Sequence, residues 1–282
     1  MVSVIIPVYN RAKTIKKSID SVLNQSFQDI EVVVVDDGST DDTALIVKEI
    51  SDPRVRYYYQ ENMGACVARN HGIDVSSGEL IAFQDSDDFW YPEKLQKQVD
   101  VILRNPSVDI VCCKTLCKKL DGSIMKSLEL HKEGIISKEV GPYGISTQTL
   151  LVKRFVFNNI RFDPKVTRYQ DLDFLLSASK NHLIYCVSEY LVERVIGEDS
   201  ITNHPDRIYD MSSYFQIKHS DIMNDKKQFL SYFLASMLID AAKNMPNYIA
   251  NKYLAKAFEL NHSFKIIVKI ALCKVRKQGN KR

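Results

Sequence analysis

The first hundred residues alternate between short apolar runs and segments whose apolar residues recur at helical spacing. The runs predict strands at residues 2–8, 30–35, 55–59 and 80–83, and the intervening segments predict helices at 12–24, 40–50, 64–75 and 93–103. Near-continuous apolar runs are typical of parallel strands that are covered on both faces. The alternation therefore predicts an α/β fold with a mostly parallel sheet flanked by helices.

The remaining two thirds of the chain are less regular. Strands are predicted at 109–116, 148–152 and 183–187, a helix at 171–180, and only helices from about residue 206. We therefore predict an α/β domain over residues 1–205, with halves at 1–104 and 105–205, and a helical C-terminal extension over 206–282. Thr40, followed by two aspartates, is expected to cap the second predicted helix.

Composition narrows the class of protein. Of the 282 residues, 45% are hydrophobic, which suffices for a large core, and the formal net charge of +3 does not indicate a nucleic-acid partner. The six cysteines include no Cys-x-x-Cys pair, which favours reduced thiols in a cytoplasmic protein over a disulfide or zinc framework. No signal-peptide pattern opens the sequence, and its longest apolar stretch falls short of the roughly 20 residues of a membrane span.

Acidic clusters follow two of the predicted strands. Residues 36–39 (Asp-Asp-Gly-Ser) come after the second strand, and residues 85–88 (Asp-Ser-Asp-Asp) come after the fourth. Ligands of open α/β sheets bind beyond the carboxyl ends of the strands. We therefore expect the two loops to converge on one edge of the sheet.

The second cluster has the composition of a partial metal site. Neighbouring carboxylates raise each other's proton affinity, so that such a cluster needs a cation or a proton. Magnesium and manganese prefer one or two carboxylates together with phosphate oxygens and water. The alternative for this cluster is a solvated acidic turn, and the loop at 36–39 can equally be an ordinary turn before a helix.

Five segments resemble, in the same order and register, the family 2 glycosyltransferases, which have the GT-A fold. They are residues 2–10 (VSVIIPVYN), 21–27 (SVLNQSF), 35–41 (VDDGSTD), 62–72 (NMGACVARNHG) and 84–92 (QDSDDFWYP). The resemblance is strong to about Arg104 and weaker to about Thr202. It implies a GT-A type, Rossmann-like sheet and an inverting transferase that moves a sugar from a nucleotide-diphosphate donor to an acceptor hydroxyl in glycan or polysaccharide assembly.

The resemblance also implies a donor site. The residues carried over to donor binding are Pro7, Tyr9, Asn10, Asp36, Asp37, Ser39, Arg69, Asp85 and Ser86. A carboxylate at Asp37 can accept from the uracil ring N–H, which favours a uridine nucleotide. Asp87 is implied as the ligand of a divalent ion, Mn²⁺ or Mg²⁺, with Asp85 close by. The ion would bridge the two phosphates and offset the charge on the departing diphosphate.

A general base is implied further along the chain. Residues 168–174 resemble the family segment in which Glu-Asp opens a helix, and Asp171 matches the aspartate that acts as the base. Gln170 replaces the usual glutamate. Asp173 is the second candidate, and the alternative role for Asp171 is a helix cap. Downstream, Ile196 stands where the family often carries a histidine, so that a phosphate contact there is absent unless His204 substitutes.

These two departures leave open a catalytically silent sugar-nucleotide-binding or scaffold protein on the same fold. A phosphorylated receiver domain is disfavoured, since residues 55–59 are followed by Gln60 and Glu61 instead of a phospho-accepting Asp. An oxidoreductase is disfavoured by the missing glycine-rich turn after the first strand. The expected partners are a UDP-sugar donor and a glycan or lipid-linked acceptor, contacted by residues 116–146.

The C-terminal residues 264–282 combine apolar and basic side chains at helical spacing. Phe264, Ile267, Val268, Ala271 and Val275 fall on one helical face, with lysines and arginines around them. Such a helix either lies on an anionic membrane surface or packs on its own domain with a solvated basic face. The first alternative would place the protein peripherally at the inner face of the membrane.

Overall fold

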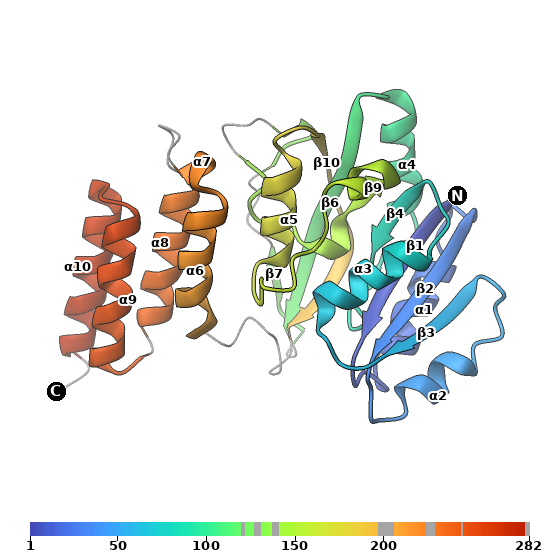
Figure 1. Ribbon diagram of the computed structural model, residues 1–282, viewed down its shortest axis with the longest axis horizontal. Helices are drawn as coiled ribbons and strands as arrows, with labels where there is room; N and C mark the ends of the chain where they lie inside the picture. Colours follow the sequence, from blue (N-terminus) through green and yellow to red (C-terminus); the bar gives the residue numbers. More distant parts are fainter. Residues whose placement is uncertain are drawn as a thin grey trace. The chain divides into compact units, whose positions relative to one another are not determined.

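The computed structural model describes residues 1–119, 122–126, 131–136, 141–196, 206–223, 229–243 and 245–279 (Figure 1). The chain divides into two compact units, Met1–Glu198 and Asp199–Arg282. The predicted boundary at residue 205 falls in the stretch 197–205, outside the described residues, so that the predicted domain limits remain a prediction.

The first unit is built from strands and helices in alternation. Its strands are β1 (Val2–Val8), β2 (Ile30–Asp37), β3 (Val55–Gln60), β4 (Leu80–Phe83), β5 (Phe89–Trp90), β6 (Val108–Lys119), β7 (Ile124–Lys126), β8 (Gly134–Ile135), β9 (Leu151–Lys153) and β10 (Leu183–Ile196). Its helices are α1 (Ile15–Leu23), α2 (Thr43–Lys48), α3 (Ala65–Val75), α4 (Lys94–Arg104) and α5 (Gln170–Ala178), with short 3₁₀ turns η1 (Thr147–Thr149) and η2 (Arg154–Asn158).

The ten strands that the structure describes form one sheet. The order is β3-β2-β1-β4-β9-β6-β10-β5, with β7 on β6 and β8 on β10. The long pairings, β3–β2–β1 and β6–β10, are parallel, as is β1–β4, whereas the short strands pair antiparallel. The predicted α/β fold with a mostly parallel sheet is confirmed, and its carboxyl edge at β1, β2 and β4 carries the loops of interest.

Both faces of the sheet are covered by helices. Strand β1 is therefore buried throughout, and its side chains alternate between two cores. Val4 and Ile6 pack with Ile15 and Ile19 of α1 on one face, whereas Ile5 packs on the other face, which α3 and α5 cover (Figure 1). Helix α3 lies close to the sheet: a Cβ at Gly72 would come within 2.4 Å of the Ile5 side chain.

Three predictions about local structure were wrong. The predicted strand at 148–152 begins only at Leu151, because residues 147–149 form the 3₁₀ turn η1. Thr40 does not cap α2, whose N-cap is Asp42. Instead, the Asp41 carboxylate accepts from the Thr43 backbone N–H at 3.0 Å. The last strand continues to Ile196 instead of ending at 187, because register shifts against β6 at residues 187–192 break the alternation that marks a strand in the sequence.

The second unit is helical. It contains α6 (Asp206–Lys218), α7 (Ser220–Met223), α8 (Phe229–Ala242), α9 (Asn247–Leu260) and α10 (Phe264–Gly279). Its interior is lined by fully buried side chains such as Phe215, Leu238 and Ala257. Of the helices that the structure describes in either unit, none has the length and apolarity to cross a membrane.

Candidate active site

The loop after β1 ties both acidic loops together. The Asn10 backbone N–H donates to the Ser39 hydroxyl at 2.9 Å, and the Asn10 side-chain oxygen accepts from the Thr40 N–H at 2.8 Å. The next residue, Arg11, lies 3.5 Å from a carboxylate oxygen of Asp87. Asn10 has a left-handed backbone (φ 51°), which asparagine tolerates better than most residues. The expected convergence of the two loops on one sheet edge is therefore present.

Asp36 shapes its own loop. One oxygen accepts from the Ser39 N–H at 2.8 Å, and the other accepts from the Tyr57 hydroxyl at 2.7 Å. The Asp36 side chain is fully buried. Burial of the Tyr57 phenol, followed by its hydrogen bond to this carboxylate, raises the pKa of Tyr57. These contacts give Asp36 a structural part in holding the Gly38–Ser39 turn.

Asp37 is engaged by the loop between β3 and α3. Its carboxylate accepts from the Gln60 amide at 2.7 Å and from the backbone N–H groups of Met63 and Gly64 at 2.9 and 2.8 Å. A carboxylate offers about four acceptor positions, and these donors fill three of them. The turn beneath it requires a glycine, since Gly38 has φ +84° and a Cβ there would lie 2.8 Å from the Asn62 nitrogen.

Three carboxylates crowd the loop at 85–88. Loss of hydration, followed by repulsion from Asp85, raises the pKa of Asp87, and Arg11 opposes that shift. Burial and the two neighbouring carboxylates raise the pKa of Asp88 well above its usual range. Asp88 turns inward and accepts from the Gln148 amide at 2.8 Å. Asp85 and Asp87, which are half-buried and exposed, are therefore the carboxylates of this loop that a ligand can reach.

Arg69 joins the acidic loop to α5. From α3, its guanidinium donates to Asp85 at 3.0 Å and to the Gln170 side-chain oxygen at 2.7 Å. The guanidinium is almost fully buried, and its Nε has no hydrogen-bond partner among the residues that the structure describes. Helix α3, the acidic loop and the start of α5 thereby meet at one arginine. The resemblance associated Arg69 with the donor site, but it did not indicate this link to Gln170.

Asp171 is the second residue of α5 and follows the Gln170 that this arginine contacts. Its carboxylate accepts from the Leu172 N–H at 2.8 Å. Burial raises the pKa of Asp171, and Arg69 and Arg194 lower it in part. Asp173, the second candidate for the base, is fully buried two residues further along the helix. Of the two, Asp171 is the less buried.

The remaining predicted donor residues lie on the same edge. Pro7 is buried in β1 opposite Val35, Tyr9 is exposed directly after β1, and Ser86 is buried in the acidic loop. His204 lies outside the described residues. So do parts of the expected acceptor region, at 120–121, 127–130 and 137–140.

Arg194 is a functional candidate that the sequence reasoning did not single out. It extends from β10, and its charge lowers the pKa values of Asp87, Asp88 and Asp171. It is thus a cation shared by the acidic loop and the candidate base. Its position two residues before Ile196, within a segment that resembles the family, was the only signal that pointed to it.

The carboxylates of this loop suit a metal ion that takes most of its ligands from a substrate. Within the described part of the chain, no group of three or more His, Cys, Asp or Glu side chains could hold a metal by itself. Asp85 and Asp87 offer the one or two carboxylates that Mg²⁺ and Mn²⁺ use together with phosphate oxygens. Their mutual repulsion gives a cation a favourable place in this loop.

Residues 3–162 match the family described as glycosyl transferase family 2. An uncharacterized glycosyltransferase of Rickettsia bellii is 34% identical over 213 residues, which cover 73% of this chain and 30% of that protein. One from Haemophilus influenzae is 30% identical over 240 residues, covering 82% and 94%. The Escherichia coli protein WfgD, named UDP-Glc:alpha-D-GlcNAc-diphosphoundecaprenol beta-1,3-glucosyltransferase, is 44% identical over 106 residues, covering 37% and 42%.

Solved structures share the fold at low sequence identity. Staphylococcus aureus TarS 1-349 in complex with UDP-GlcNAc has a TM-score of 0.70 and 21% identity, over 99% of this chain and 92% of that one. The mannosyltransferase PcManGT of Pyrobaculum calidifontis, in complex with GDP-Man and Mn²⁺, has a TM-score of 0.60 and 17% identity, over 100% and 88%. The fold of this chain is therefore that of the GT-A glycosyltransferases.

Proposed function

This chain belongs to glycosyl transferase family 2, and on that basis we propose that it transfers a sugar from a UDP-sugar to an acceptor hydroxyl, with inversion at the anomeric carbon. The observation that carries the proposal is the double contact of Arg69 with Asp85 and Gln170. Through these two contacts, the candidate metal-binding loop at 85–88 lies next to α5, the helix that carries the candidate base.

Recognition of the donor is assigned to the loops after β1 and β2. Tyr9 is exposed there, and the Asp37 carboxylate keeps one acceptor position that suits the ring N–H of uracil. The 44% identity to WfgD, whose name gives a UDP-linked donor, supports a uridine nucleotide. The complex of TarS with UDP-GlcNAc is consistent with the same donor class.

A divalent ion is assigned to Asp87 and Asp85, together with the donor diphosphate. When bound, it would neutralise charge on the leaving diphosphate. Arg11, which lies 3.5 Å from Asp87, and Arg69, 3.0 Å from Asp85, hold these carboxylates in place. The Mn²⁺ in the PcManGT complex supports a metal in this fold.

The proton transfer is assigned to Asp171. Its carboxylate would accept the proton of the acceptor hydroxyl while that oxygen forms a bond to the anomeric carbon. The bond from the anomeric carbon to the diphosphate oxygen breaks on the opposite face, which inverts the sugar. The raised pKa of Asp171 makes it a stronger base than an exposed aspartate.

The acceptor belongs to glycan assembly, and a lipid-linked sugar is the class that we favour. The support is the name of WfgD, which acts on an undecaprenol-linked sugar. A second relative, AmsB of Erwinia amylovora, is named for amylovoran biosynthesis and is 32% identical over 191 residues.

A screen of nucleotide sugars tests this function. We expect release of UDP from one or more UDP-sugars, dependent on added Mn²⁺ or Mg²⁺ and stimulated by a lipid-linked acceptor. GDP- and CMP-sugars serve as matched controls. Binding of UDP without any turnover, across UDP-sugars and acceptors, would instead support the catalytically silent alternative.

A further inference from the structure

Helix α10 has two apolar faces, and one of them is exposed. Ile266 and Cys273 are buried against the other helices of the second unit. On the opposite side Ile267, Val268 and Leu272 have 44%, 38% and 64% of their surfaces exposed. We call these three residues the outer face of α10. The sequence placed Ile267 and Val268 on one apolar face, and the structure shows that this face is not the one that packs on the domain.

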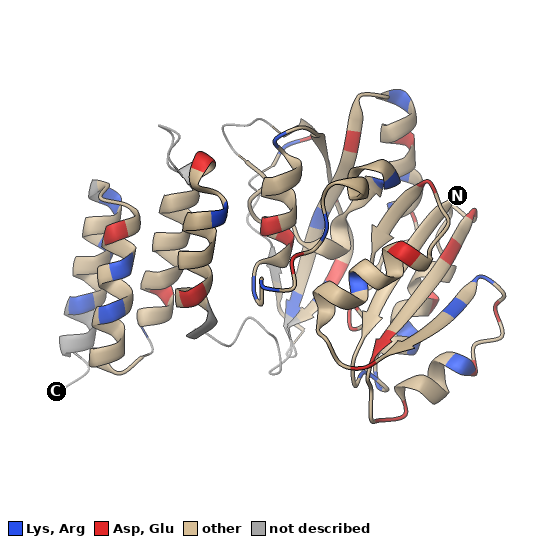
Figure 2. Cartoon of the chain, viewed as in Figure 1, with Lys and Arg blue, Asp and Glu red and all other residues tan. Residues whose placement is uncertain are grey.

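Basic side chains border the outer face. Lys265 and Lys274 are exposed on its two sides, and Lys269 lies beside Lys265, where it donates to the Ser236 hydroxyl at 3.0 Å. The sequence from residue 261 to 282 contains seven lysines and arginines and no acidic residue. Figure 2 shows basic residues, coloured blue, along α9 and α10. An apolar stripe with basic borders is the pattern of helices that lie on anionic membranes.

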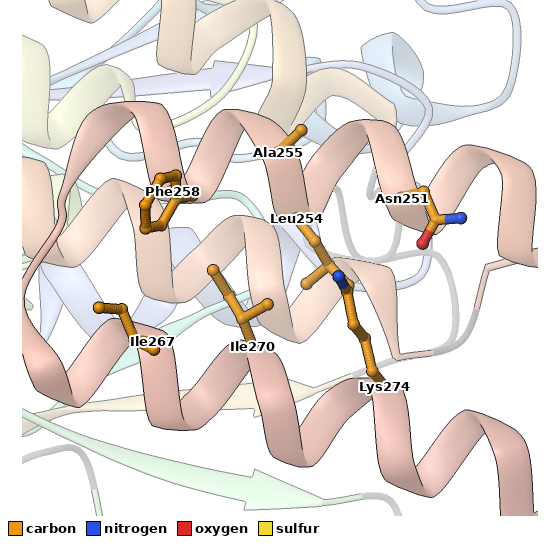
Figure 3. A pocket seen from close by; sticks show the side chains of 7 residues that line it. All are labelled: Asn251, Leu254, Ala255, Phe258, Ile267, Ile270 and Lys274. Atoms are coloured by element: carbon orange, nitrogen blue, oxygen red, sulfur yellow. The ribbon is translucent and has the colours of Figure 1, made fainter.

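An apolar groove runs beside the outer face. It has a volume of about 430 Å³ and lies between α9 and α10, where Leu254 and Phe258 face Ile267 and Ile270 (Figure 3). Lys274 stands at one end of it. Together the groove and the outer face form a continuous apolar surface with a cationic margin.

The positive charge of this surface decides between two possible partners, a second copy of the chain and an anionic lipid surface. Two copies of the chain that met through their outer faces would bring lysine borders together, with no acidic residue after Glu259 to pair with them. An anionic lipid surface pairs with the same lysines while its acyl region accepts Ile267 and Leu272. We propose that α10 docks this protein on an anionic membrane surface, parallel to the plane of the bilayer.

Co-sedimentation of the full chain with vesicles tests the proposal. The vesicles are phosphatidylcholine alone or phosphatidylcholine with 30% phosphatidylglycerol, a composition chosen for the assay at about physiological ionic strength. We expect binding only to the anionic vesicles, weakened by salt. Leu272→Ser should reduce the affinity about tenfold. Lys265→Gln with Lys274→Gln should reduce it roughly fivefold for each charge removed.

Ile217→Ser is the matched control, because Ile217 is 79% exposed on α6 and its replacement should leave vesicle binding unchanged. Equal binding of wild type and Leu272→Ser, or no binding to anionic vesicles, would overturn the proposal. So would sedimentation equilibrium showing a dimer that Leu272→Ser dissociates. The readout does not depend on sugar transfer, so that this inference and the proposed function fail separately.

Discussion

At the scale of single residues, Asp171 carries the most specific chemical assignment. Replacement by asparagine keeps the side-chain size and the helix start but removes the proton acceptor. We expect Asp171→Asn to fold and to bind UDP as the wild type does, while turnover falls by about 10²–10⁴. Initial rates of UDP release with an acceptor, together with calorimetric UDP binding, measure the two effects separately.

Asp173→Asn is the companion variant for this test. Because Asp173 is fully buried, its replacement should lower the melting temperature. Turnover per folded molecule should stay near that of the wild type. Near-normal turnover in Asp171→Asn, with a large loss in folded Asp173→Asn, would move the role of base to Asp173.

The residues differ in how well the sequence predicted them. Asp36 and Asp37 stand side by side, yet one holds its own turn and the other holds the loop at Met63–Gly64. Their different partners come from other strands, which no local pattern encodes. Arg194 was missed for the same reason. Its charge acts on Asp87, which lies more than a hundred positions away in the sequence, and on Asp171, which belongs to another element, helix α5.

At the scale of elements, the carboxylate of Glu31 stabilises the end of the sheet that lies away from the candidate site. Glu31, at the start of β2, accepts from the Ser3 hydroxyl at 2.6 Å and from the Ser77 N–H at 2.6 Å, and it pairs with Arg56 at 2.8 Å. Burial alone would raise the pKa of Glu31, but these hydrogen bonds lower it from 4.5 to about 2. Glu31 therefore ties the starts of β1 and β2 to the turn before β4.

Glu31→Gln should lower the free energy of unfolding by about 3 kcal/mol at pH 7. Because the folded-state pKa lies below the unfolded value, the contribution is complete above about pH 4.5 and disappears as the pH falls toward about 2. Denaturant unfolding at pH 7, 5 and 3 measures the difference from wild type. Glu49→Gln, an exposed glutamate at the end of α2, is the control, and a difference that stays constant with pH would contradict the assignment.

The elements themselves were predicted where their periodicity is uninterrupted. The first four parallel strands and their helices follow the apolar pattern closely. Strands β1, β2 and β4 are buried on both faces, whereas the edge strand β3 is only partly buried. Strand β10 was predicted too short because irregular pairing at residues 187–192 brings polar side chains into its middle. The three-residue strand β9 lies between β4 and β6, and its place in the sheet depends on pairings that a short apolar run does not reveal.

At the scale of the whole molecule, the parallel topology decides where the chemistry can occur. The strands β1, β2 and β4 end at one edge, so that Asn10 and Arg11 contact both the Ser39 loop and the Asp87 loop. Arg69 then extends the same edge to α5. The family sequence pattern identified these loops, and the sheet explains why they lie next to each other.

Calorimetric titration of the full chain with UDP and with uridine, each with and without Mn²⁺, tests this arrangement most directly. If one loop binds the base and the other binds a cation beside the diphosphate, Mn²⁺ should tighten the binding of UDP by about tenfold or more, or at least 1.4 kcal/mol, and leave that of uridine unchanged. Asp87→Asn should remove the effect of Mn²⁺ and retain uridine binding. Tightening of UDP that is equally large in Asp87→Asn, or no effect of Mn²⁺ on the wild type, would contradict the account.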